Sequence, residues 1–246
     1  MDKKPIIGIT CPWSEETWGA TVDGGGYNYA GRAYISAIYR AGGIPVLIPP
    51  VFETESLTQD AENIINLVDG IYFTGGGNVK RPPSSVLKTL YEQQPVRSVW
   101  EEELIKLAYK NDMPALGVCR GHQMIAVALG GKMDTVRKEE HKQSTPMSQG
   151  SHNVKVEKGS LLYNLIGEES WFVNSLHVER VEELPSGFIS AAVADDGGVE
   201  AISATDKLFF MGTQFHPELM PDDEKSKKIF SGFITAAKKY KEYIKS

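Results

Sequence analysis

Short apolar runs alternate with amphipathic segments through the first half of the chain. The apolar runs have the length of strands and end in proline, glycine or a cysteine, whereas the segments between them repeat apolar residues at the spacing of a helical face. Strands that alternate with helices pair in parallel, because each helix carries the chain back to the start of the next strand. The expected strands are 5–10, 44–50, 70–74 and 114–119, and the expected helices are 33–42, 54–70, 98–112 and 120–131.

From about Ser151 the pattern changes to closely spaced strand-like segments at 152–157, 170–174, 187–195, 199–204 and 207–215. These segments predict antiparallel or mixed additions at one side of the same sheet. The last segment, 222–246, reads as a closing helix with acidic residues at its start and lysines toward its end, as the helix dipole favours. No repeat or linker divides the chain, so we expect one α/β domain over 1–246, with an open, mostly parallel sheet and helices on both faces.

Composition narrows the class of protein. Hydrophobic residues make up 41% and charged residues 24% of the 246 residues, which is ordinary for a globular chain. The net charge of -6 argues against broad binding to nucleic acid or to anionic membranes. We find neither an apolar run of about 18 residues nor an export signal, so two unpaired thiols in a reducing cytoplasm is the favoured interpretation.

One of the two cysteines stands between glycines where an expected strand meets a helix, in the run Gly117-Val118-Cys119-Arg120-Gly121. This pattern has the form of a nucleophile elbow, a tight turn that projects a reactive side chain at the carboxyl end of a parallel strand. The helix start favours the thiolate form of such a cysteine, and the Arg120 N–H can donate to an oxyanion. A purely structural turn remains the alternative when the motif is taken alone.

A second strand end supplies a base for this thiol. His216 follows the apolar run "LFFMGTQF", and Glu218 comes two residues later, where an extended backbone points both side chains the same way. The histidine could simply cap its strand. The two motifs together, in the order cysteine, histidine, glutamate, favour a triad of Cys119 as nucleophile, His216 as base and then acid, and Glu218 as its orienter. Cys11, which precedes proline and has no glycine elbow, reads as a small buried residue.

The runs "GVCRGHQMIAVALGG" and "GTQFHPE" resemble the class I glutamine amidotransferase-like domain, which has a flavodoxin-like sheet. "GITCPW", "YISAIYRAGGIPVLIP", "DGIYFTGGGNV", "VNSLHVERV" and "DDGGVEAI" narrow the resemblance to the gamma-glutamyl-gamma-aminobutyrate hydrolase family, peptidase C26, over about residues 5–233. The resemblance implies hydrolysis of a small gamma-glutamyl amide such as 4-(gamma-glutamylamino)butanoate, a compound of polyamine catabolism. It implies no cofactor, and none of the five histidines has metal-ligand spacing with a cysteine or a carboxylate pair, so no metal is expected.

The resemblance also extends the site beyond the triad. The Gly75-Gly76-Gly77 loop is implied to line the substrate, with Gly76 donating a second oxyanion N–H, although three glycines alone fit a plain turn. Gln123 is implied to hold the glutamyl group. Asn174 and His177 are candidate pocket residues, and for His177 a core or surface role is an equal alternative.

The chain departs from the family near the expected pocket mouth. Asn78 follows the glycines, Arg97-Ser98 replaces an arginine–aspartate pair, and Glu101 keeps the expected acid, so Asn78 and Ser98 are where we expect the leaving amine to be recognised. Two rival functions remain: a glutaminase subunit that delivers ammonia to a separate synthase, and a non-catalytic protein that binds gamma-glutamyl ligands or a partner. The sequence is compatible with a homodimer.

Overall fold

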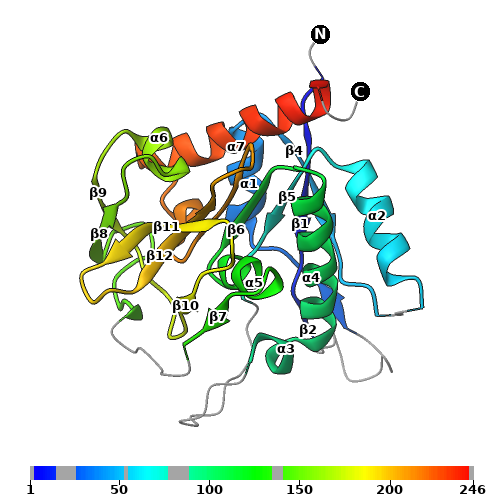
Figure 1. The fold of residues 1–246 in the computed structure, drawn as a ribbon, viewed down its shortest axis with the longest axis horizontal. Helices are drawn as coiled ribbons and strands as arrows, with labels where there is room; N and C mark the ends of the chain where they lie inside the picture. Colours follow the sequence, from blue (N-terminus) through cyan, green and yellow to red (C-terminus); the bar gives the residue numbers. More distant parts are fainter. Residues whose placement is uncertain (1–2, 15–25, 53–54, 77–88, 135–140, 244–246) are drawn as a thin grey trace.

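A nine-stranded sheet organises the computed structural model, which describes residues 3–14, 26–52, 55–76, 89–134 and 141–243 (Figure 1). The strands β4, β1, β5, β6 and β13 pair in parallel, and β12, β11, β8 and β9 continue the sheet in antiparallel pairs. The strand bounds, in sheet order, are β4 Ile44–Ile48, β1 Ile6–Thr10, β5 Gly70–Phe73, β6 Ala115–Val118, β13 Phe210–Thr213, β12 Val199–Ala204, β11 Phe188–Ala194, β8 His152–Val156 and β9 Ser170–Val173.

Helices cover both faces of this sheet and bury two apolar cores. One core lies under α1, α6 and α7, and the other lies under α2, α4 and α5. The helix bounds are α1 Arg32–Arg40, α2 Leu57–Leu67, α3 Leu90–Gln93, α4 Pro95–Lys110, α5 Arg120–Ala128, α6 Leu161–Ile166 and α7 Glu224–Tyr243. The predicted fold class, an open and mostly parallel sheet with antiparallel additions in the C-terminal half, is confirmed.

Several short elements were not predicted. Helix α3 begins with a capping box between Thr89 and Glu92. Helix α6 starts at the Ser160 cap and ends at Gly167, whose φ of 78° suits glycine. Two small antiparallel pairs, β2 (Trp13–Ser14) with β3 (Tyr27–Asn28) and β7 (Lys132–Met133) with β10 (Val181–Glu183), also lie outside the main sheet. These elements are too short to show a hydrophobic period in the sequence. Only the capping residues of the two helices could have predicted any of them.

The order of strands decides where the site lies. Strand β13, near the end of the chain, lies between β6 and β12. Its parallel pairing with β6 places the residues after Thr213 beside those after Val118, and β5 brings the glycine loop to the same edge. Among the described residues, none of the helices has the length and apolar character that a bilayer crossing needs.

Candidate active site

Cys119 lies where β6 turns into α5, and its backbone is strained. Its φ of 52° is rare for a residue with a side chain and is typical of an elbow that projects a nucleophile. Close backbone contacts explain the glycines: a Cβ atom would lie 2.6 Å from the Gly121 carbonyl carbon if placed on Gly117, and 2.0 Å from the Phe73 carbonyl oxygen if placed on Gly121. The turn thus leaves the thiol partly exposed at the carboxyl edge of the sheet.

This packing predicts a stability effect for Gly121→Ala. The added methyl would collide with the backbone of β5, which cannot move without disturbing the sheet, so we expect the free energy of unfolding to fall by about 1–3 kcal/mol. Gly232→Ala in α7 is the matched control, because its methyl would come closest to the flexible end of Leu165 and not to backbone. Urea denaturation measures both. Equal stabilities for the two variants would contradict a tight contact between α5 and β5.

His216 contacts Glu218 as the sequence suggested, but the backbone between them has a different conformation from the one expected. Nδ1 of His216 lies 2.7 Å from Oε1 of Glu218, and both side chains are buried. Glu218 lies in the 3-10 helix Pro217–Leu219 and not in an extended segment, so the expected extended geometry is wrong; Pro217 turns the chain after His216. A Cβ atom on Gly75 would lie 3.3 Å from Cε1 of His216 and 3.7 Å from Cβ of Cys119, so both side chains border the same glycine.

Charge around His216 sets its protonation. Burial by itself lowers the pKa of His216, but the Glu218 carboxylate and the Cys119 sulfur outweigh burial and raise that pKa well above its ordinary value. We therefore expect Glu218→Gln to lower the His216 pKa, because the substitution removes a neighbouring negative charge. The alkaline limb of the pH profile of kcat/KM should then move to lower pH, with a loss of about 10²-fold in kcat.

A pH–rate profile of the two proteins measures this shift. Glu168→Gln, at an exposed carboxylate that pairs with Lys225, removes the same charge from a group that does not act on His216 and should leave the alkaline limb in place. An alkaline limb that does not move in Glu218→Gln would contradict the electrostatic role of that carboxylate.

Asn174 positions the backbone of His216. Its side-chain oxygen accepts a hydrogen bond from the His216 N–H at 2.8 Å, and its amide nitrogen donates to the carbonyl oxygens of His216 at 2.9 Å and Met147 at 2.7 Å. The side chain is fully buried, and each of its polar groups is used within the protein. The expected contact of Asn174 with a substrate stays a prediction, and the hydrogen bonds give this residue a positioning role.

Among the described residues, two backbone N–H groups at this edge lack a backbone acceptor. Arg120 is the first residue of α5, so its N–H has no acceptor within the helix, and Gly76 makes no backbone hydrogen bond within the described residues. The Gly75 N–H instead donates to the hydroxyl of Tyr34 at 3.1 Å. Gly77 and Asn78, both expected at the site, lie outside the described residues.

Tyr34 on α1 is a neighbour of the site that sequence reasoning missed. Burial raises the pKa of its hydroxyl well above the ordinary value, and the charges of Glu218 and Cys119 add to the effect. The phenol therefore stays protonated, and its position beside Gly75 fixes the glycine loop. The one sequence signal that could have indicated Tyr34 is its position on a helix that follows a glycine-rich segment.

A buried charge cluster of Arg97, Glu101 and Arg120 contacts the start of the glycine loop. Arg97 donates to the carbonyl oxygens of Thr74 at 2.8 Å and Gly75 at 3.0 Å, and Glu101 bridges Arg97 at 2.8 Å and Arg120. Burial alone raises the pKa of Glu101, but the two guanidinium groups outweigh it and hold that pKa below its usual value.

The expectation that the pocket mouth is flanked by Arg97, Ser98 and Glu101 is wrong. Ser98 is completely buried, donates from its hydroxyl to the Leu90 carbonyl oxygen at 2.8 Å and accepts from Arg120 at 2.7 Å. It therefore cannot recognise a leaving amine. Arg97 and Glu101 are also completely buried, because α4 packs them against the loop after β5.

Gln123 and His177 lie close to the site with their side chains turned inward. The Gln123 amide donates to the Glu179 carbonyl oxygen at 3.0 Å and to the Gln214 side chain at 3.1 Å. His177 lies with Nδ1 3.1 Å from the same carbonyl oxygen, and its ring is buried. Their expected contacts with a substrate stay predictions.

Two other groups have no place in the reaction. His122 is completely buried against Gly212, and burial lowers its pKa to about 4, so its ring stays neutral. Cys11 is unpaired and buried, as predicted, and burial raises the pKa of its thiol to about 11. Neither residue therefore competes with His216 or Cys119.

A nucleophile elbow, a histidine–carboxylate pair and a glycine loop on three adjacent strands invite comparison with known proteins. The family profile described as peptidase C26 matches residues 5–218, which is most of the chain. The chain belongs to the peptidase C26 family. The match ends on Glu218, so it includes all three residues of the candidate triad.

Relatives within and around the peptidase C26 family agree with this placement. The gamma-glutamyl-gamma-aminobutyrate hydrolase of Escherichia coli O157:H7 is 34% identical over 222 residues, covering 82% of this chain and 84% of the relative. A glutamine amidotransferase-like protein of Rickettsia prowazekii is 28% identical over 285 residues, covering 97% of this chain and 99% of the relative. These matches support a hydrolase of the glutamine amidotransferase-like type.

A solved structure shares the fold at lower identity. A Thermoplasma acidophilum protein, described as one of the subunits of GMP synthase, superimposes with a TM-score of 0.64 and 18% identity, covering 99% of this chain and 100% of that one. At this identity the likeness concerns the fold alone.

Proposed function

We propose that this peptidase C26 member hydrolyses the gamma-glutamyl amide bond of a small molecule such as 4-(gamma-glutamylamino)butanoate, in the cytoplasm. The observation that carries the proposal is the arrangement at three strand ends: the strained Cys119, the buried His216–Glu218 pair and the glycine loop. The 34% identical hydrolase of Escherichia coli O157:H7 supports the choice of substrate class.

The first half of the reaction forms a thioester. The Cys119 sulfur attacks the side-chain carbonyl carbon of the glutamyl group, and the N–H groups of Arg120 and Gly76 stabilise the negative charge on oxygen. The His216 imidazolium protonates the departing nitrogen as its bond to carbon breaks, because an amine leaves far more readily than an amide anion. The amine is released, and the glutamyl group remains on sulfur.

The second half uses the same groups in reverse. The neutral imidazole of His216 takes a proton from water, whose oxygen attacks the thioester carbon at the same oxyanion site. Collapse of this intermediate breaks the carbon–sulfur bond and releases glutamate. Glu218 stabilises the imidazolium in both halves through its 2.7 Å contact with Nδ1, and no residue changes its net protonation over the cycle.

Comparing substrates without any partner protein tests this proposal. We expect kcat/KM for 4-(gamma-glutamylamino)butanoate to exceed that for glutamine by about tenfold or more, because the larger amine offers additional binding energy in the transition state. Glutamate release is measured for both. Turnover of glutamine alone, stimulated by a second protein, would identify a glutaminase subunit instead. No turnover over a panel of gamma-glutamyl amides would identify a binding protein.

A further inference from the structure

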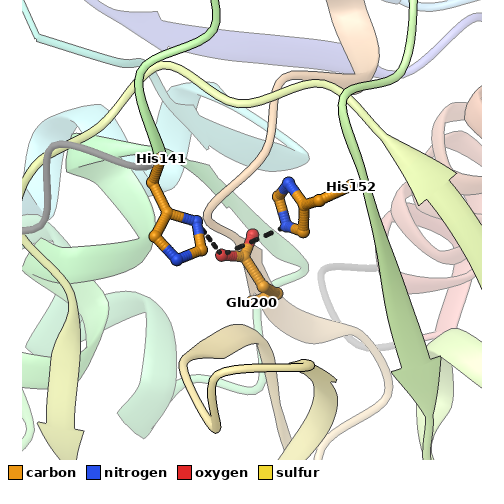
Figure 2. Close-up of side chains that lie close together, drawn as sticks. All are labelled: His141, His152 and Glu200. Carbon is orange, nitrogen blue, oxygen red and sulfur yellow. Dashed lines mark ion pairs between the residues drawn. The ribbon is translucent and has the colours of Figure 1, made fainter.

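Three histidines converge on one buried carboxylate, on the side of the fold formed by the antiparallel strands. Glu200 lies on β12 and His152 begins β8, while His141 and His177 come from segments beside them. Oxygen Oε1 of Glu200 lies 3.5 Å from Nδ1 of His141, 3.6 Å from Nε2 of His152 and 3.2 Å from Nε2 of His177. Figure 2 shows the rings of His141 and His152 facing the carboxylate.

These facing atoms are buried but make no hydrogen bonds. Within the residues that the structure describes, none of the three ring nitrogens has a hydrogen-bond partner, and neither oxygen of Glu200 has one. Glu200 is 1% exposed, so water does not compensate these groups from bulk solvent. Five unpaired polar atoms at one point are costly, because each loses hydration without gaining a bond.

In two of the rings, the hydrogen bond made by the outer nitrogen, which faces away from Glu200, determines whether the inner nitrogen, which faces Glu200, carries a hydrogen. Nε2 of His141 lies 3.1 Å from a carboxylate oxygen of Asp196, and Nδ1 of His177 lies 3.1 Å from the Glu179 carbonyl oxygen. Both partners only accept hydrogen bonds, so these outer nitrogens carry the ring hydrogens. In the neutral ring the inner nitrogen of each histidine is then a bare lone pair directed at the carboxylate of Glu200.

Lone pairs that meet a carboxylate repel one another unless a proton or a metal cation lies among them. The outer hydrogen bonds to a carboxylate and to a carbonyl oxygen are those that orient histidines bound to metal ions. In a tetrahedral zinc site with bonds of about 2.0–2.1 Å, neighbouring ligand atoms lie about 3.3–3.4 Å apart. Nδ1 of His141 and Nε2 of His152, at 3.5 and 3.6 Å from Oε1 of Glu200, lie close to this spacing.

We propose that His141, His152 and Glu200 bind a divalent cation of the zinc type, with the His177 ring packed against the same carboxylate. The ligand atoms of the first three residues all lie within 4.8 Å of one another. Imidazole and carboxylate donors in a tetrahedral arrangement favour zinc over magnesium, which requires six oxygen-rich positions. The site is separate from the proposed hydrolytic reaction and does not depend on it.

The cation would secure a segment that both sites share. Asn174 holds the backbone of His216, the Leu176 carbonyl oxygen lies 4.0 Å from the Cys119 sulfur, and His177 reaches the cluster. An ion held by these three side chains would join β8, β12 and the segment that carries His141, and Nε2 of His177 contacts the Glu200 ligand at 3.2 Å. We therefore assign the cation a structural role, fixing this segment beside the thiol.

Metal content and thermal stability test the site directly. The untagged, full-length protein is purified without chelator from zinc-supplemented medium, and its metal is counted by mass spectrometry. We expect about one zinc ion per chain. Removing it by chelation should lower Tm by about 5–10 °C, and adding Zn²⁺ alone should restore it, because the ion binds only the folded state. Mg²⁺ should have no effect.

Variants locate the ion. His152→Ala and Glu200→Gln should each weaken Zn²⁺ binding by at least about 100-fold, and His152→Cys should retain binding because thiolate is a zinc ligand. Cys119→Ala and His216→Ala are the controls and should keep the ion, since both lie in the hydrolytic site. His152, with its side chain 23% exposed, is the position least prone to unfold the chain when replaced.

Two results would overturn the proposal. One is a protein without stoichiometric metal whose Tm does not respond to Zn²⁺, which would make the cluster a set of histidines that share protons with Glu200. The other is an ion retained equally by His152→Ala, Glu200→Gln and the wild-type protein, which would place the metal elsewhere.

Discussion

Replacing Cys119 with alanine is expected to reduce kcat/KM for a gamma-glutamyl amide by about 10⁴-fold or more, because the substitution removes the atom that attacks the carbonyl. Alanine keeps the volume small at the elbow, and its methyl occupies the position of the present Cβ. Folding should therefore be preserved, and the loss should appear in turnover. Rapid quenching followed by intact-protein mass spectrometry should detect a glutamyl adduct on the wild-type chain and none on Cys119→Ala.

The second cysteine provides the matched control. Cys11 is buried at the end of β1, with its thiol donating to the Ile9 carbonyl oxygen at 3.6 Å, and Cys11→Ala should retain kcat/KM within a few-fold. Both variants have one thiol, so only the position differs. Substantial turnover by Cys119→Ala, or an adduct that persists in it, would refute the assignment of the nucleophile.

The second large effect is expected at Glu101. Glu101→Gln keeps the shape of the side chain but leaves the guanidinium groups of Arg97 and Arg120 buried without a negative charge between them. Removing one partner of a buried charge cluster costs about 3–5 kcal/mol, because the remaining charges are neither paired nor hydrated. We expect the free energy of unfolding at pH 7 to fall by that amount in urea denaturation.

Two comparisons sharpen this result. Glu103→Gln removes the same charge on the same helix, at a residue with no ion pair among the described residues, and should change stability by less than about 0.5 kcal/mol. Because the folded pKa of Glu101 lies below its unfolded value, its stabilisation is fully present above about pH 4.5 and declines as the pH falls through the folded pKa. The gap between Glu101→Gln and wild type should narrow in acid, and a gap independent of pH would contradict this origin.

The sequence was most informative where local chemistry and strand ends coincide. Gly117 and Gly121 predicted an elbow at Cys119 because no other residue allows the backbones of β6, α5 and β5 to approach so closely. The order of apolar runs predicted the parallel half of the sheet, and His216 and Glu218 were paired from their spacing alone. The pairing survived although the backbone between them is a turn.

Long-range side-chain partners could not be predicted in this way. Ser98 and Glu101 occupy polar helix positions that look solvated in the sequence, and only the packing of α4 against the loop after β5 makes them buried. The convergence of His141 and His152 on Glu200 depends on the pairing of β8, β11 and β12, which no spacing rule for metal ligands describes. Tyr34 reaches Gly75 for the same reason, across elements far apart in the chain.

The position of β13 in the sheet has a consequence during synthesis of the chain. Because β13 pairs with β6 on one side and β12 on the other, the middle of the sheet is completed by a strand that is synthesised after both of its neighbours. Until then a nascent chain holds Cys119 without His216 or Glu218, the two residues that the proposed reaction pairs with this thiol. If the proposed triad is right, a chain fragment that ends before β13 therefore lacks two of its three residues.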